Sequence, residues 1–271
     1  MFLLSRMSRA YRGLNARDWA LLSLETICLV AGIFIAFQLN EWAAGRNAAR
    51  KHAMLMDRLF EETENDVTFI RAGRDTLRKN LADEKAFAVA LGGDTCPSDK
   101  HFQALSTVHR YPALSTPTSV YQELMGAGGL SSIDRLDVRD GLTNFHTNLA
   151  WTQGQLDLFR AGRVVPVDDD DPRGRSRFSP NSDEPAIVTF NRQALCDDPA
   201  FHNKVVSATR NHMVFVSYLE ELLKDAINMC VKLGDSLDRT CQPRYGGPLV
   251  GEDAEFAAQT LAAMRKEKSA N

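Results

Sequence analysis

The residue types that carry most enzyme chemistry form one visible cluster in this chain of 271 residues. Asp168–Asp171 place four carboxylates in a row within the segment VDDDDPRGRSR. Carboxylate oxygens bind divalent cations, but a calcium-binding loop needs alternating ligands, a central glycine and a distal glutamate. The run lacks that order. We therefore expect a solvated acidic loop whose carboxylates pair with the nearby Arg173, Arg175 and Arg177.

The histidines likewise form no catalytic or metal-binding motif. Neither an HExxH pair nor a zinc-type Cys/His spacing occurs among His52, His101, His109, His146, His202 and His212. His146 and His212 lie on or beside apolar helical seams, where a hydrogen-bonded core histidine is expected. The sequence also lacks the G-x-S-x-G, P-loop and dinucleotide-binding signatures. We therefore expect no cofactor, no metal and no catalysis.

The composition excludes several classes of protein. Thirty-two Lys and Arg residues against thirty-five Asp and Glu leave a net charge of −3, so no basic field points to nucleic acid as a partner. A hydrophobic fraction of 44% and a charged fraction of 25% are typical of a chain that buries a core. These values exclude a wholly disordered chain and a polytopic transporter.

A single apolar segment lies near the N-terminus, from Trp19 to Trp42. As a helix rising about 1.5 Å per residue, its 24 residues span about 35 Å, enough to cross a hydrocarbon core of ~30 Å. Eleven of them are Leu, Ile, Val or Phe, which together favour insertion by about 3 to 7 kcal/mol, whereas Glu25 opposes it by at most about 3 kcal/mol. We predict a transmembrane helix over residues 19–42, with Trp19 and Trp42 as interface anchors.

Two other interpretations of this segment are a buried core helix and a cleaved signal peptide. A core helix does not need tryptophan at both ends and flanking arginines. A signal peptide has a shorter apolar region and a small-residue cleavage site, and NEWAAGR contains no convincing cleavage triplet. An uncleaved single-span anchor is the better interpretation, and it makes the lipid bilayer the first expected partner.

The charges that flank the segment give little guidance on its orientation. Four basic residues lie on either side: Arg6, Arg9, Arg12 and Arg17 before it, and Arg46, Arg50, Lys51 and Arg58 after it. The short tail, residues 1–18, only weakly favours a cytoplasmic N-terminus.

The cysteines favour the same orientation. Cys28 lies in the span, and four others lie outside it: Cys96, Cys196, Cys230 and Cys241. An even set fits two disulfides in an oxidising compartment, and the alternative is buried, reduced thiols. Three pairings are possible and the spacing does not choose between them. Our preference is Cys96–Cys196 with Cys230–Cys241.

The span also carries a resemblance to a known family. The pattern E-x4-V-x-G-I-x-I-A-x-Q-x-N-x-W is made by Glu25, Val30, Gly32, Ile33, Ile35, Ala36, Gln38, Asn40 and Trp42. It resembles the N-terminal span of a bacterial family of single-span membrane proteins of unknown function. Thr116–Ile133 is similar to that family's second recognisable stretch, through Tyr121, Glu123, Leu124 and Gly129. The resemblance implies an envelope protein with a mostly helical domain and implies no reaction.

Glu25 is the costliest residue of the span, because intramembrane carboxylates usually face protein or water. On a helical wheel it shares a face with Cys28, Gly32 and Ala36, which form a small-x3-small ridge of the kind that lets two helices approach closely. This face predicts a protein partner or a homo-oligomer through the membrane helix. The alternative is a solitary helix in which Glu25 reaches toward the head groups.

Apolar seams predict helices in the rest of the chain. A first seam is expected to continue from the span, with Arg74 and Glu84 as interruptions, and two later seams repeat about every 3.5 residues, as in bundles. Gly126 to Gly129 are expected to end a short helix. The predicted helices cover residues 56–91, 101–109, 119–126, 138–159, 205–237 and 252–266.

Residues 164–198 break this helical pattern. They are rich in Pro, Asp, Arg, Ser and Asn, and they are long for a connection inside a compact domain. Val164-Val165 and Ile187–Phe190 could form short strands. We expect a long irregular loop between the last two long helices.

These observations predict an all-α protein in which one N-terminal transmembrane helix runs into an extracytoplasmic helical bundle, residues 43–271. The expected location is a bacterial inner membrane, crossed once, with the bundle in the periplasm. The expected function is a membrane-anchored interaction or assembly module. The alternative is an envelope enzyme or a ligand-sensing ectodomain with its site near the 164–198 loop.

Overall fold

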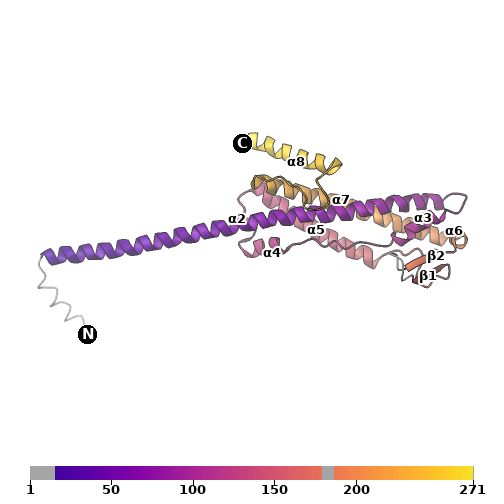
Figure 1. The fold of residues 1–271 in the computed structure, drawn as a ribbon, viewed down its shortest axis with the longest axis horizontal. Helices are drawn as coiled ribbons and strands as arrows, with labels where there is room; N and C mark the ends of the chain where they lie inside the picture. Colours follow the sequence, from indigo (N-terminus) through magenta and orange to yellow (C-terminus); the bar gives the residue numbers. More distant parts are fainter. Residues whose placement is uncertain (1–15, 179–185, 271) are drawn as a thin grey trace, which may run out of the picture. The chain divides into compact units, whose positions relative to one another are not determined.

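The computed structural model describes residues 16–178 and 186–270, and this part of the chain is mostly helical, with one small two-stranded sheet (Figure 1). The all-α prediction is confirmed. Residues 1–56 and 57–271 form two units, and the second is called the bundle unit below. The first helix, α2, runs from Ala16 to Leu91, so the helix predicted after the span is continuous with it. Most of the expected tail, residues 1–18, lies outside the described residues.

The other predicted helices are present close to their predicted positions: α3 (Asp99–Phe102) with η2 (Gln103–Ser106), α4 (Ser119–Gly126), α5 (Leu136–Ala161), α7 (Pro199–Ser236) and α8 (Gly251–Ala270). Two further short helices, η3 (Gly129–Ser132) and α6 (Arg192–Cys196), were not predicted. The turn after α4 falls on the predicted glycines, because Gly128 and Gly129 take φ angles of 116° and 65°. Side chains other than glycine rarely adopt such angles.

Three long helices form the bundle unit: the part of α2 after residue 57 lies beside α5 and α7 (Figure 1). Their predicted seams supply Leu77, Leu81, Leu156, Val216 and Leu219 to one buried apolar cluster, and Tyr111 and Phe215 complete it. Burying one such leucine or phenylalanine contributes roughly 1.5–3 kcal/mol, so this contact is a main source of the bundle's stability. Helix α8 packs on α7.

A second apolar cluster lies where α2 ends and α7 begins. Its buried members include Phe87, Phe102, Leu195 and Phe201, whose rings and side chains pack against one another. The Phe87 and Phe102 ring centroids are 5.0 Å apart. This cluster holds α3, η2 and α6 against the long helices.

The 164–198 connection contains more regular structure than the sequence predicts. Strands β1 (Gly174–Phe178) and β2 (Ala186–Phe190) pair antiparallel, and α6 follows them. The predicted strand at 187–190 is confirmed, but the predicted strand at Val164-Val165 is wrong. Val164 packs against the second apolar cluster instead. β1 escaped detection because its sequence, GRSRF, is mostly polar and its side chains after Gly174 are exposed.

Two carboxylate side chains accept hydrogen bonds from backbone amides at helix N-termini. Asp198 accepts a hydrogen bond from the Ala200 amide at 2.8 Å and precedes Pro199, so α7 begins with an N-cap and a proline in its first turn. Glu62 of α2 accepts from the amides of Val120 and Tyr121 at 2.9 and 3.0 Å. This side chain thereby fixes the N-terminus of α4 on α2.

Candidate functional site

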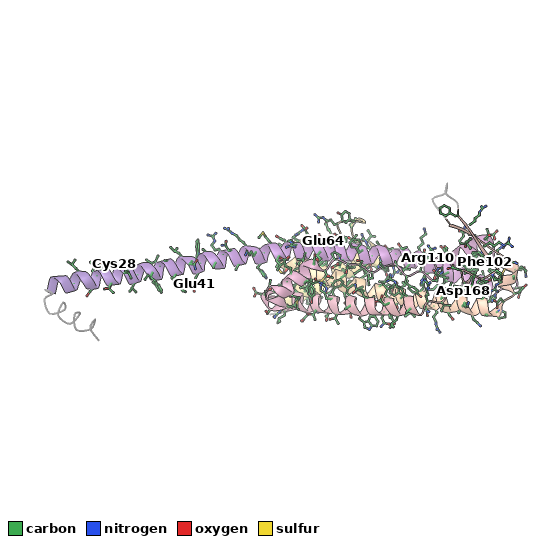
Figure 2. The ribbon with its side chains drawn as sticks, turned by 90° about the horizontal axis from the view of Figure 1, so that it is seen from below. Cys28, Glu41, Glu64, Phe102, Arg110 and Asp168 are labelled. Atoms are coloured by element: carbon green, nitrogen blue, oxygen red, sulfur yellow. A yellow bond between two sulfur atoms is a disulfide. The ribbon has the colours of Figure 1, made fainter. Side chains whose placement is uncertain are left out.

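The predicted association face lies entirely on α2 and is exposed within the chain. The side chains of Glu25, Cys28 and Ala36 are exposed, and apart from the adjoining helix backbone nothing lies within 4 Å of the place where Gly32 would carry a Cβ. Cys28 is a free cysteine, and it is labelled on this stretch of α2 in Figure 2. The predicted association face is therefore not covered by any other described part of the chain.

The two predicted interface anchors differ in what the structure describes. Trp42 is exposed, and the guanidinium carbon of Arg46 lies 4.7 Å from the centroid of its ring. Trp19 lies in α2, but its side chain is outside the described part of the structure.

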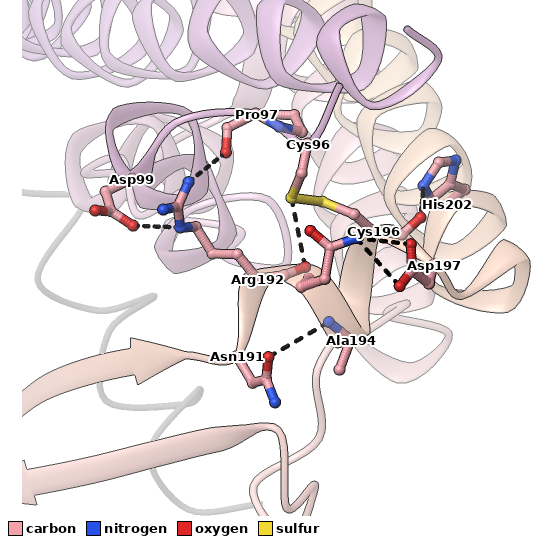
Figure 3. Close-up of a disulfide and its surroundings, with 10 residues drawn as sticks. Cys96, Pro97, Asp99, Asn191, Arg192, Ala194, Cys196, Asp197 and His202 are labelled. Carbon is pink, nitrogen blue, oxygen red and sulfur yellow. Dashed lines mark hydrogen bonds and ion pairs between the residues drawn. A yellow bond between two sulfur atoms is a disulfide. The ribbon is translucent and has the colours of Figure 1, made fainter. Parts of the chain in front are cut away.

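The four cysteines of the bundle unit form two disulfides, Cys96–Cys196 and Cys230–Cys241. These are the two pairings that we prefer from the sequence. The first joins the segment after α2 to the end of α6 (Figure 3). The second joins α7 to the segment that leads to α8. The second therefore locks an irregular segment onto a long helix, whereas the first ties the segment after α2 to the short α6.

Polar contacts fix the surroundings of the first disulfide (Figure 3). Arg192 donates to the carbonyl oxygen of Pro97 at 2.8 Å and forms an ion pair with Asp99 at 2.6 Å. His202 Nε2 lies 3.0 Å from the carbonyl oxygen of Cys196. These groups hold the backbone around the disulfide in place.

The acidic run is bound into the structure at both ends. Asp171 forms an ion pair with Arg173 at 2.7 Å, and Arg173 also reaches Asp198 at 2.6 Å. Hydrogen bonds from the side chain and the backbone amide of Arg173 lower the pKa of Asp171 to about 2. Asp168 pairs with Lys204 of α7 at 3.1 Å. The pairing with Arg173 agrees with the sequence expectation, but among the described residues no ion pair joins the run to Arg175 or Arg177, and Lys204 was missed.

Among the described residues, no group of three or more His, Cys, Asp or Glu side chains is placed to hold a metal ion.

His146, one of the predicted core histidines, stacks on Tyr121 with ring centroids 3.4 Å apart. Burial lowers its pKa to about 4, so it is neutral at physiological pH.

The seam interruptions predicted in α2 are buried rather than solvated. Glu84 is 1% exposed. Its two carboxylate oxygens lie 3.0 and 2.9 Å from Nδ1 of His212, within hydrogen-bond distance. The Thr107 hydroxyl lies 3.1 Å from the same carboxylate. Tyr111 meets the His212 ring edge-to-face at 4.7 Å. Spacing gave a signal here, because Glu84 follows Leu81 by three residues on the same seam.

Arg74 is the other interruption, and it forms a buried bidentate ion pair. Its two terminal nitrogens lie 2.7 and 2.8 Å from the carboxylate oxygens of Asp253 in α8. Burial lowers the pKa of Arg74, but hydrogen bonds and charges from Asp253 and Asp75 outweigh it and raise the pKa overall. Arg71 donates to the carbonyl oxygens of Gly246, Gly247 and Pro248. Arginines of α2 therefore hold the C-terminal segment on the bundle.

A cavity of about 740 Å³ opens near the C-terminal end of α5. Three separate stretches line it: Thr76, Leu77 and Asn80 of α2; Thr107, His109, Arg110, Tyr111 and Pro112; and Arg160 and Arg163. Arg110 is labelled in Figure 2. Sequence reasoning missed this site because its basic residues lie about 50 positions apart and share no helix.

Comparison with known proteins adds no assignment to this geometry. No family model matches the chain, and no curated protein or solved structure matches it.

Proposed function

We propose that this protein is a membrane-anchored helical interaction or assembly module that crosses the bilayer once. One observation carries the proposal. The most apolar 18-residue window of α2 is long enough for a span, and none of it is buried within the chain. A core helix of a water-soluble protein would bury such a window, so this segment needs an apolar medium from outside the chain.

Lipid suits this segment better than a soluble protein partner does. Leu29, Phe37, Ile27, Ile35 and Leu39 are each 57–64% exposed. At about 100° per residue these side chains point around the whole helix, whereas a docking helix shows an apolar stripe on one face. An all-round apolar surface is what a membrane-spanning helix presents.

The proposal places the bundle unit outside the cytoplasm of a bacterial cell. Its support is the pair of disulfides, because such bonds persist in oxidising compartments and are rare in the cytosol. The sequence resemblance to single-span envelope proteins points the same way. In that arrangement the segment before α2 lies in the cytoplasm.

The interaction role rests on the membrane face of Glu25, Cys28, Gly32 and Ala36. Small residues let two helices approach closely, and a partner would shield the Glu25 carboxylate from lipid. We propose a protein partner or a second copy of this chain at that face, and we propose no catalytic activity.

Labelling with a membrane-impermeant maleimide tests the orientation. In chains that carry Cys28→Ala, we would place one new cysteine in the bundle, Ser131→Cys, where the side chain is exposed, and in a second chain one in the N-terminal segment, Ser8→Cys. In spheroplasts of a bacterial host, the Ser131→Cys chain should react at once and the Ser8→Cys chain only after lysis. The opposite pattern would place the bundle in the cytoplasm and refute the proposal.

A further inference from the structure

The cavity at the end of α5 has an unusual charge balance. Arg110, Arg160 and Arg163 line it together with His109, and no carboxylate is among its lining residues. Within the described part of the chain, no acidic side chain pairs with Arg110 or Arg163. Concentrating positive charge in a concave surface raises the local potential and attracts anions.

The third arginine is oriented but not neutralised. Arg160 donates from Nη2 to the carbonyl oxygen of Tyr111 at 3.2 Å, which holds its guanidinium at the cavity wall. Its nearest carboxylate, on Asp157, lies 3.9 Å from Nη1 and is 79% exposed. An exposed ion pair of that length contributes little, so the Arg160 charge also remains available.

The pKa of His109 reflects the positive charges near it. Burial lowers its pKa, and the charges of Arg110 and Arg163 lower it further. Its Nδ1 atom is buried and has no hydrogen-bond partner in the described structure. A bound anion would relieve the repulsion among these groups.

The wall behind the cavity is fixed by the buried Glu84–His212 pair. Thr107 contacts Glu84 and Tyr111 contacts His212, so two lining residues are held from behind. The Glu84 carboxylate is fully buried and its oxygens are taken up by His212 and Thr107. Its charge therefore does not serve as a partner for the arginines on the cavity side.

We infer that this cavity binds a small soluble organic anion that carries carboxylate or phosphate groups. Arginine guanidinium groups bind both kinds of oxyanion through paired hydrogen bonds. The volume of about 740 Å³ lies within the range of small-molecule sites, roughly 300–1,000 Å³. Leu77, Tyr111 and Pro112 supply an apolar wall for the carbon skeleton. Asn80 adds an amide that can donate to an oxygen.

The inference goes beyond the proposed function and does not depend on it. Every lining residue belongs to the bundle unit, so a small anion could bind whether or not α2 crosses a bilayer. A failed orientation experiment would leave the cavity inference standing, and failed anion binding would leave the membrane anchor standing.

Calorimetry on the full chain tests it. The protein, with its disulfides intact, would be placed in nanodiscs of zwitterionic phosphatidylcholine and titrated at constant ionic strength. The probes are citrate, succinate, inorganic phosphate and glucose 6-phosphate, with glucose as the neutral control. The cavity variant is Arg110→Gln with Arg163→Gln. Its matched control is Arg175→Gln with Arg177→Gln, which removes the same charge from exposed positions of β1.

At least one anionic probe should bind saturably to the wild type and to the β1 control, and glucose should not bind. The cavity variant should bind that probe about tenfold or more weakly, as expected when two oxyanion contacts are lost. Its melting temperature without a probe should match that of the control, because both arginines are exposed. Equal weakening in both variants, or no saturable binding of any probe, would overturn the inference. Two parallel titrations use nanodiscs with anionic phosphatidylglycerol and a polyglutamate peptide as probe, and binding seen only in these would overturn the inference too.

Discussion

Helix α2 exposes apolar side chains in one stretch and buries polar ones in another. In residues 20–51 every described side chain is exposed, including Leu29 at 61% and Phe34 at 63%. In the bundle unit, the same helix buries Glu62, Arg74 and Glu84 to 6% exposure or less. The difference shows that burial in this chain follows the partners available to each stretch. Hydrophobicity alone would predict the reverse.

The buried polar groups are tolerated because most of them are paired. An unpaired buried charge costs several kcal/mol, whereas Glu62 accepts backbone amides, Arg74 meets Asp253, and Glu84 meets His212. The exposed apolar stretch has no equivalent partners within the described chain. It must find them in lipid or in another protein.

The largest expected effect comes from placing an unpaired charge in the bundle core. Leu223 is 1% exposed on α7, so Leu223→Asp should destabilise the protein by about 4 kcal/mol or more. Asp169→Asn, at an exposed position of the acidic run, should change stability by less than about 0.5 kcal/mol. Thermal unfolding of the two full-length variants in detergent measures both. Equal shifts in melting temperature would show that the bundle core is misplaced.

A smaller loss is expected when a buried charge keeps its place but loses its buried partner. Asp253→Asn removes the bidentate acceptor of Arg74, leaves it the exposed Asp75, and should cost about 2 kcal/mol. Glu221→Gln breaks an exposed pair with Lys224 and should cost no more than about 0.5 kcal/mol. Denaturant unfolding distinguishes the two. If Asp253→Asn proves as mild as Glu221→Gln, pairing is not what makes the buried polar groups of α2 acceptable.

The helices were predictable from sequence because each long one carries an apolar seam with helical spacing. The seam on α7, with Leu219 and Leu223, and the seam on α5, with Leu142 and Phe145, are both buried as expected. The glycine turn at Gly128 was predictable for a local reason, since few other residues adopt its φ angle. Signals of this kind depend only on neighbours in the chain.

Features that join distant residues could not be predicted in the same way. Arg74 and Glu84 interrupt a seam in the sequence, and only folding reveals Asp253 and His212 as their partners. The cavity depends on Arg110 meeting the end of α5, which no spacing specifies. For the disulfides, the sequence supplied an even count and left three pairings open.

Asp66 is the exception among the buried polar groups of α2, and it predicts a pH dependence. Burial, and then the charge of Glu62, raise its pKa from 3.8 to about 8. The folded protein therefore keeps a proton that the unfolded chain releases. The contribution of Asp66 to the free energy of unfolding is fully present below about pH 4 and is lost as the pH rises through about 8.

Asp66→Asn should remove that loss and stabilise the protein at pH 8 by about 1 kcal/mol or more, with little effect near pH 4. Asp83→Asn, at an exposed position of α2, is the matched control and should show no such gain. Melting temperatures of the three proteins across this pH range provide the measurement. A wild type and an Asp66→Asn variant with parallel pH profiles would contradict the assigned protonation.

The smallest effect concerns the exposed stretch and its proposed association face. Gly32→Ile places a branched side chain on the small-residue ridge and should weaken pairing of the span by about 1 kcal/mol. Ala31→Ile, one position along and on another face, is the control. A transmembrane association reporter that carries residues 19–42 compares them. Equal signals from the wild type and Gly32→Ile would show that the small-residue ridge does not mediate helix association.

Membrane extraction tests most directly whether the exposed apolar stretch is a span. Leu29→Arg, Ile33→Arg and Phe37→Arg together should oppose insertion by about 9 kcal/mol, more than the span's apolar side chains supply. The control adds three arginines at exposed apolar positions of the bundle unit, Val89, Leu136 and Val206. After an alkaline carbonate wash, the wild type and the control should remain in the membrane pellet, and the span variant should not. Release of the wild type, or equal retention of the span variant, would contradict a membrane anchor.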